Sequence, residues 1–567
     1  MKRTVSLLVV VLVVFGAGLA SGWQGRMAGM GDPFGLVADE SDFLIHPAMI
    51  ADGQGFKLYA HYGFEYRRVT DWNWGFDLNG PITSPLFGPI TGIGLGGSFN
   101  QEGTEYHHQG LLGVAFPLGS GKMGVFFTYK GKRADFDGDN SLAFSAPGLG
   151  PGVSAGALFS SGMENDLDDF ALRLLYGAPL GGGFRLGGEI QVAYLRDRNE
   201  FSSAFRSAFL DIGGAVFTVG PPAVNWNMSN QFWGDMFPFG FPHDSNYWDT
   251  TFKMSLDGKV GPAKFGLTAR GGVVVSGDNE WDYSESFSIP AIPVSLNNRF
   301  DLDGDVSGWK IGGDFWLRYP VNEALSLPFV VRADYGNLQR NGSAVGQFDV
   351  AVGGPPPLLA IAVPLGWDYS SNQKAFNVEA GGGLDIALSK STRVAAGLYY
   401  DYIQTKQDMA LNLSLMPVGL PILLNMDYGE YPESTEHRMV FKVVGETMMS
   451  PGFTLRGGLN AFYGWVSEDY RFQPNLTSTV PPGLTILTNR ASADGSHWGV
   501  GGAMGASFKL QNVTLEPYVN GGYQELSVND GSAATNVLGG LVNVPWDVEK
   551  ERREWFIGGG LSVLFGP

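Results

Sequence analysis

Apolar and polar side chains alternate without a break in the stretch FKLYAHYGFEYR at residues 56–67. Every second residue from Phe56 to Tyr66 is apolar, and the residues between them are mostly polar or small. Successive side chains of a β-strand point to opposite faces, so this stretch has one wholly apolar face. Twelve such residues are more than the roughly five or six of a strand in a soluble sandwich, and they suit a tilted strand that crosses a bilayer.

The same pattern recurs as a series of hairpins. Residues 110–132 turn at 119–122, residues 170–196 turn at 181–183, and further hairpins are centred near Gly261, Val321, Ser389, Pro451 and Gln511. A first strand at 56–68 and a last at about 552–565 bring the total to about sixteen strands, within a range of 14–18. Turns inside hairpins take roughly two to six residues and connections between hairpins about twenty to fifty, as in outer-membrane barrels. We therefore expect an all-β fold, a membrane-spanning antiparallel up-and-down β-barrel over residues 55–567, with short periplasmic turns and eight long extracellular loops.

Both ends of the chain carry targeting features. Lys2 and Arg3 precede an apolar run at 7–20 and small residues follow it, which predicts a cleaved secretory signal at 1–22. The final strand, WFIGGGLSVLF at 555–565, ends near an aromatic residue and resembles the signal read by the barrel-assembly machinery of Gram-negative bacteria. These features predict the outer membrane, where lipid and lipopolysaccharide surround the barrel.

Composition narrows the functional classes. The chain has 83 glycines, 13% aromatic and 16% charged residues, and no cysteine, which favours a barrel and excludes disulfides and thiolate metal sites. A net charge of −19 gives no reason to expect nucleic acid as a partner. The seven histidines show no metal-ligand spacing, and no Ser–His pair stands out, so we expect no enzyme and no cofactor.

Charged residues occupy the face of the predicted strands that is not apolar. They include Arg185, Glu189, Arg270, Asp314, Arg332 and Arg456. A lipid-facing Arg or Lys at the bilayer midplane costs about 2–4 kcal/mol, so these side chains must face the lumen. There they either brace the wall as ion pairs or line a charged constriction.

The predicted loops share apolar segments interrupted by proline and glycine, at 80–97, 146–159, 219–226, 289–296, 354–365, 416–424, 480–487 and 537–546. Together they exceed the apolar surface that a soluble face tolerates, so they either pack on one another as a cap or bind an apolar ligand or partner.

The third loop, at about 197–248, is the longest. Phe201, Phe205 and Phe209 are spaced as one face of a short helix, and Trp226, Phe232 and Trp233 follow. These aromatic residues form either a substrate-binding groove or the core of a folded-in constriction.

Two Asp-x-Asp-Gly-Asp motifs fall in predicted loops at the outer rim. They contain Asp135, Asp137 and Asp139, and Asp301, Asp303 and Asp305. Alternate carboxylates suit Ca²⁺, but neither motif has the downstream Glu of a complete calcium loop. We therefore interpret both motifs as solvated turn acids, with a Ca²⁺ site at the outer rim as the alternative.

Residues 23–54 lack β alternation and are expected in the lumen or at its periplasmic mouth, as a plug or a strap. Within them, Gly29-Met30-Gly31, Ala38-Asp39-Glu40 and His46-Pro47-Ala48-Met49-Ile50 resemble the N-terminal region of the FadL-type transporters of long-chain fatty acids and hydrocarbons. That resemblance implies a plug, with Asp39, Glu40, His46 and Pro47 at its motif positions. It also implies that residues of the third and fourth loops form the site that first captures the substrate. His46 stands where the family has Asn, and the family's barrels have fourteen strands.

Three functions follow from these features. The first is a passive outer-membrane transporter of small hydrophobic substrates, gated by the plug. The second is a water-filled porin with a loop-three constriction. The third is a structural barrel, a sheath for a partner or an adhesive surface. The sequence leaves the oligomeric state open.

Overall fold

A computed structural model of the 567-residue chain describes most of its length. The described residues are 40–53, 55–78, 82–84, 88–90, 94–145, 153–212, 215–220, 225–229, 243–289, 294–353, 359–415, 424–478, 484–485, 487–537 and 542–566. They form β-strands and two short 3-10 helices, η1 (Glu40–Leu44) and η2 (Pro47–Asp52). None of the described helices is long and apolar enough to cross a membrane.

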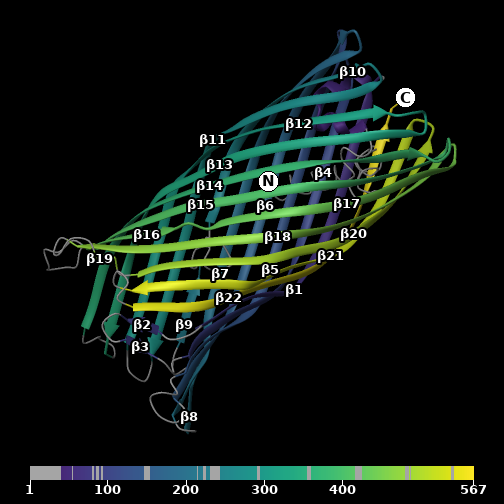
Figure 1. The fold of residues 1–567 in the computed structure, drawn as a ribbon. Helices are drawn as coiled ribbons and strands as arrows, with labels where there is room; N and C mark the ends of the chain where they lie inside the picture. The colour runs from purple at the N-terminus through teal and green to yellow at the C-terminus, as the bar shows by residue number, and fades with distance from the viewer. Residues whose placement is uncertain are drawn as a thin grey trace.

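Sixteen long strands of the described chain close into one antiparallel barrel (Figure 1). They are β1 (Lys57–Leu78), β4 (Gly94–Leu118), β5 (Gly121–Ser145), β6 (Val153–Gly181), β7 (Phe184–Ile212), β10 (His243–Val260), β11 (Ala263–Ile289), β12 (Val294–Pro320), β13 (Leu325–Val352), β14 (Leu359–Ala387), β15 (Thr392–Leu415), β17 (Glu433–Ser450), β18 (Phe453–Ser478), β20 (Leu487–Leu510), β21 (Val513–Val537) and β22 (Val542–Phe565). Each pairs with its neighbour in this order, and β22 pairs with β1 from Leu58↔Phe565 to Leu78↔Trp546, which closes the ring. The predicted fold class and strand number are confirmed.

Six short strands extend the wall at one end. They are β2 (Ile82–Ser84), β3 (Gly88–Ile90), β8 (Ala215–Val219), β9 (Asn225–Ser229), β16 (Leu424–Glu430) and β19 (Leu484–Thr485). At the opposite end seven tight turns join the long strands at the predicted positions. Gly119 and Gly261 adopt φ of 57° and 58° in two of these turns, a left-handed conformation that glycine tolerates best.

Outward-facing aromatic rings form a girdle around the barrel about eleven residues from the short turns. Tyr194, Tyr335, Tyr402 and Tyr523 are each the eleventh residue of their strand. Rings meet across neighbouring strands in the pairs Tyr66–Tyr106, Tyr66–Trp555, Tyr129–Phe170, Tyr194–Trp248, Trp309–Tyr335, Phe376–Tyr402 and Trp498–Tyr523, with centroids 4.8–5.9 Å apart. Eleven residues at about 3.4 Å each, tilted by about 45°, rise about 25 Å, the height of the apolar band of an outer-membrane barrel. The girdle therefore marks the boundary of the membrane's apolar layer on the side away from the short turns.

The strands continue far beyond this girdle. β7 has 29 residues, of which eighteen follow Tyr194, enough to rise about 40 Å above the lipid at the same tilt. Only four residues (290–293) separate β11 from β12, and seven (146–152) separate β5 from β6. The expectation of loops of twenty to fifty residues was wrong in most places, because the sequence criterion required an apolar outer face. Above the membrane that face meets water, so the strand persists while the apolar alternation ends.

The polarity of the wall changes in this extracellular part. Asp135, Asp137 and Asp139 are exposed on the outer face of β5, whereas Phe136 between them is 1% exposed and faces inward. Phe136 packs with Val69, Trp72, Ala134 and Met163 in an inner apolar cluster. The barrel is thus apolar outside at membrane level and has apolar side chains inside above it.

Candidate functional site

Residues 40–53 lie inside the barrel near the short turns, packed against one wall. Phe43, Leu44 and Ile50 are buried together with inward-facing residues of β1, β4, β5 and β6, namely Tyr59, Leu111, Ala115, Phe126 and Leu175. The Phe43 ring is 5.6 Å from that of Tyr59 and 5.2 Å from that of Phe126. We call residues 40–53 the inner segment.

The inner segment also reaches the opposite wall. Ile45 packs against a second buried cluster, formed by Val330, Ala395, Tyr399 and Val444 on β13, β15 and β17. Four strands separate this wall from the first one in each direction around the ring. Apolar contacts on two opposite walls mean that the segment crosses the lumen instead of lining one side of it.

A row of small residues on neighbouring strands forms a seat for Pro47 and Ala48. The row consists of Gly177 on β6, Gly187 on β7, Ser255 on β10 and Thr268 on β11, and each residue is the cross-strand partner of the next. A Cβ on Gly187 would lie 2.1 Å from the Ala48 nitrogen, and one on Gly177 would lie 2.9 Å from the Pro47 oxygen. At positions 177 and 187, therefore, only glycine allows the backbone of η2 to lie against the wall.

The polar members of the same row bind the inner segment. The Ala48 N–H donates to Ser255 Oγ at 2.6 Å, and His46 Nδ1 lies 2.5 Å from Thr268 Oγ1. His46 is 1% exposed, and this burial lowers its pKa from the ordinary 6.5 to about 4, so the ring is neutral at pH 7. Asp52, at the end of η2, forms an ion pair with Arg185.

Two cations donate to the Leu44 carbonyl, and one carboxylate binds both cations. Arg173 Nη2 donates to Leu44 O at 2.6 Å, and Lys253 Nζ donates to it at 3.0 Å. The Glu189 carboxylate accepts from Arg173 Nε at 2.8 Å and Nη2 at 2.9 Å, and it lies 3.4 Å from Lys253 Nζ.

The other predicted lumen residues are also ion-paired on the inner face. Arg270 contacts Asp314 and, at 2.6 Å, Asp334, while Arg332 contacts Asp314 at 2.7 Å. Arg456 donates to Glu516 at 2.9 Å. The structure places these charges in pairs that brace the wall.

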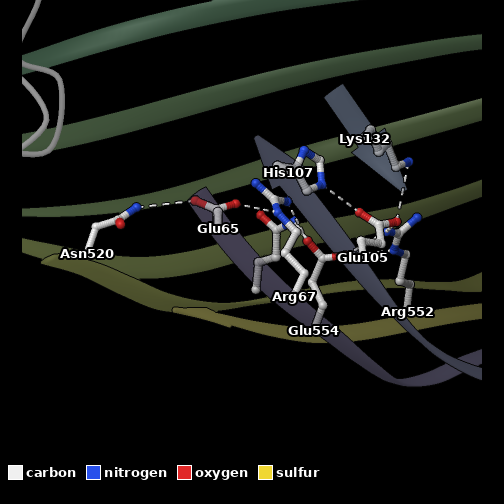
Figure 2. A network of polar contacts seen from close by, with 9 residues as sticks. Glu65, Arg67, Glu105, His107, Lys132, Asn520, Arg552 and Glu554 are labelled. Atoms are coloured by element: carbon white, nitrogen blue, oxygen red, sulfur yellow. Dashed lines mark hydrogen bonds and ion pairs between the residues drawn. The ribbon is translucent and has the colours of Figure 1, made fainter. Parts of the chain in front are cut away.

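Another network of polar side chains lines the inner wall near the girdle (Figure 2). Glu554 accepts hydrogen bonds from Arg67 and Arg552, at 2.9 Å each. Glu105 lies 3.1 Å from Arg552, 3.5 Å from Lys132 and 3.0 Å from His107. On this wall the polar group separates the apolar cluster around Phe136 from the one that holds the inner segment.

The predicted helix in loop three is absent, because β7 runs through Phe201, Phe205 and Phe209. A spacing of four residues fits one face of a strand as well as a helix, and the ladder with β6 satisfies the backbone of this stretch. Phe205 pairs with Phe159 but Ser207 pairs with Leu158, so Arg206 is an extra residue in a bulge. The bulge changes the alternation, which puts Phe205 and Phe209 on opposite faces.

Of the remaining predicted loop-three residues, Trp226 alone is among those that the structure describes. Trp226 lies on β9, which pairs with β7 and β11 and so belongs to the wall. Phe232 and Trp233 lie outside the described residues, as does Asp39 of the predicted plug; Glu40 begins η1, and Pro47 begins η2.

The two aspartate motifs lie on strands instead of loops. Asp301, Asp303 and Asp305 are exposed on β12, and Asp139 on β5 pairs with Arg206 at 2.7 Å. Among the described residues no three acidic or histidine side chains are grouped to hold a metal ion.

Sequence reasoning missed the seat. Gly177, Ser255 and Thr268 are unremarkable on their own strands, and the signal that could have found them is a row of small inward positions shared by adjacent strands. That row requires the register between strands, which turn positions give only approximately.

The chain is similar to several solved barrels over nearly its whole length. It matches a Pseudomonas aeruginosa FadL homologue with 11% identity over 96% of this chain and 98% of the other, at a TM-score of 0.32. It matches the Pseudomonas putida toluene transporter TodX with 10% identity over 95% and 98%, at 0.34, and the CymD monoaromatic hydrocarbon channel with 11% identity over 97% and 98%, at 0.32. At this similarity the matches establish neither family nor function, and the barrel rests on its own strand ladder. No family model and no curated protein matches the sequence.

Proposed function

We propose that this chain is a passive outer-membrane transporter of small hydrophobic molecules and that the inner segment is a plug that gates its lumen. The observation that carries the proposal is the crossing of the lumen: Phe43 and Ile50 are buried on one wall and Ile45 packs on the opposite wall. A segment held at both walls obstructs the path, so passage requires it to move.

The apolar inner surface supports a hydrophobic substrate. Trp72, Phe136 and Met163 face inward above the membrane, where a pore for hydrophilic solutes would need a water-lined wall. A substrate of fatty-acid or hydrocarbon type is what the resemblance of residues 29–50 to the FadL-type transporters implies. Energy need not be supplied, since the solute moves down its gradient.

The porin alternative has less support. It requires loop three to fold into the lumen, whereas the described part of that region continues the wall as β7, β8 and β9. In the described wall Arg270, Arg332 and Arg456 are ion-paired, which favours a bracing role over ion selectivity.

Uptake measurements test the proposal. Cells that lack their own transporters for hydrophobic compounds would express the chain and be given labelled toluene, a labelled long-chain fatty acid or a labelled disaccharide. We expect faster uptake of a hydrophobic compound than in cells with empty vector, with the disaccharide unchanged. Uptake of the disaccharide alone would indicate a porin. No gain for any solute, together with a stoichiometric co-purified protein, would indicate a structural barrel.

A further inference from the structure

The contact at Leu44 depends on a buried carboxylate of the wall. The Glu189 side chain is fully buried, and it touches both cations that donate to the Leu44 carbonyl. Glu189 itself is not bonded to the plug in any contact described above. Its effect on the plug must pass through Arg173 and Lys253.

We propose that Glu189 is the latch residue of the plug: it positions Arg173 and Lys253 so that both donate to the Leu44 carbonyl and hold the plug closed. This inference rests on the proposed function, because a latch has meaning only if the plug moves. Glu189 is a positioning residue, since it acts through the two cations.

The geometry explains why one carboxylate controls two donors. Arg173 binds Glu189 through two parallel N–H···O bonds, which fixes the plane of the guanidinium and directs the same Nη2 at Leu44 O. Lys253 is the direct cross-strand partner of Glu189, so its ammonium stays beside the carboxylate. Without the negative charge, two buried cations would repel each other at close range, and at least one would leave the carbonyl.

The position of the latch agrees with this role. Glu189 lies on the same face of β7 as Gly187, two residues further from the turn. The plug backbone lies directly against Gly187, where an added Cβ would be 2.1 Å from the Ala48 nitrogen. A change at Glu189 therefore acts where the plug backbone already touches the wall.

Cysteine protection tests the latch directly. The chain contains no cysteine, so Met49→Cys introduces a unique thiol in the half-buried part of the plug. The purified full-length barrel would be treated with a bulky maleimide, and the labelling rate measured at pH 7. With Glu189→Gln we expect labelling at least tenfold faster than in the Met49→Cys background. Lys253→Met leaves the Arg173 contact in place and should give a smaller increase.

Glu554→Gln is the matched control, because Glu554 is also buried and also holds two cations, Arg67 and Arg552, but near the girdle. We expect it to leave labelling unchanged, even if both variants lower the thermal unfolding temperature equally. If Glu189→Gln fails to fold, Glu189→Asp keeps the charge and should fold and label at an intermediate rate. Labelling of Glu189→Gln at the background rate, or equally fast labelling of both Gln variants, would overturn the latch. The readout does not depend on transport, so a failed uptake experiment would leave this result interpretable.

Discussion

A methyl group at position 187 should dislodge the plug while leaving the barrel intact. The Cβ of Gly187→Ala would lie 2.1 Å from the Ala48 nitrogen and 2.4 Å from the Pro47 carbonyl carbon. Ordinary contact begins at 3.4 Å, so the plug backbone must retreat by about 1.3 Å. Both near atoms belong to backbone, which cannot rotate away as a flexible side chain can.

The retreat has a calculable cost. It lengthens the 2.6 Å hydrogen bond from the Ala48 N–H to Ser255 and leaves a buried donor unsatisfied, which costs about 1–3 kcal/mol. Crowding of a packed interface adds about 1–3 kcal/mol. Together these contributions amount to about 2–6 kcal/mol, and about 3 kcal/mol already raises the open population roughly a hundredfold. Single-channel recording in planar bilayers should therefore show long open events that are rare in the unmodified protein.

Gly188→Ala is the control for this substitution. Gly188 is the next residue of β7 and faces away from the lumen, and its Cβ would meet nothing nearer than the Lys253 oxygen at 3.7 Å. Its recordings should match those of the unmodified protein. Closed recordings for Gly187→Ala, with the variant shown to be folded, would mean that the seat does not hold the plug.

Three further outcomes follow from the geometry. Acid should release the plug, because His46 has a pKa of about 4 when docked and 6.5 when free. Docking is therefore fully favoured above pH 6.5 and weakens by up to about 3 kcal/mol as the pH falls to 4. His46→Asn should make the conductance less pH-dependent. Ile190→Arg places a charge on the lipid-facing side of β7 and should lower the free energy of unfolding in lipid by about 2–4 kcal/mol, measured by denaturant titration. Val345 is 73% exposed and lies ten residues above the girdle residue Tyr335. Val345→Arg should therefore cost less than about 0.5 kcal/mol. Ser255→Ala should weaken docking by about 1 kcal/mol, seen as a modest rise in open events.

Sequence periodicity was sufficient for the membrane part of the fold. There the outer face meets hydrocarbon and the inner face meets polar groups, so alternation such as that from Phe184 to Tyr194 reports the strand directly. It was insufficient above the girdle, where Asp135 and Asp137 face water outside and Phe136 is buried inside. The strand continues there, but its polar residues face outward and its apolar residues face inward. A search for strands with an apolar outer face therefore takes this part of the strand for a loop.

The candidate site was predictable in part. The missing alternation before Phe56 indicated a segment that is not a strand, and the charged residues Arg185 and Glu189 were placed on the inner face by periodicity alone. The contacts that hold the plug join residues more than a hundred positions apart, such as Leu44 with Arg173 and Ala48 with Ser255. One sequence gives no register between strands that distant, so the seat and the latch emerged only with the fold.

Conductance of the barrel with and without residues 25–54 tests the central claim most directly. Both forms would be purified and inserted into planar bilayers in the same salt, with insertion verified by heat-modifiable migration on gels. If these residues obstruct the lumen, the intact protein should stay largely closed and the shortened one should show large, steady conductance. Equal conductance from two folded forms would contradict the account, because it would mean that a segment crossing the lumen does not control passage through it.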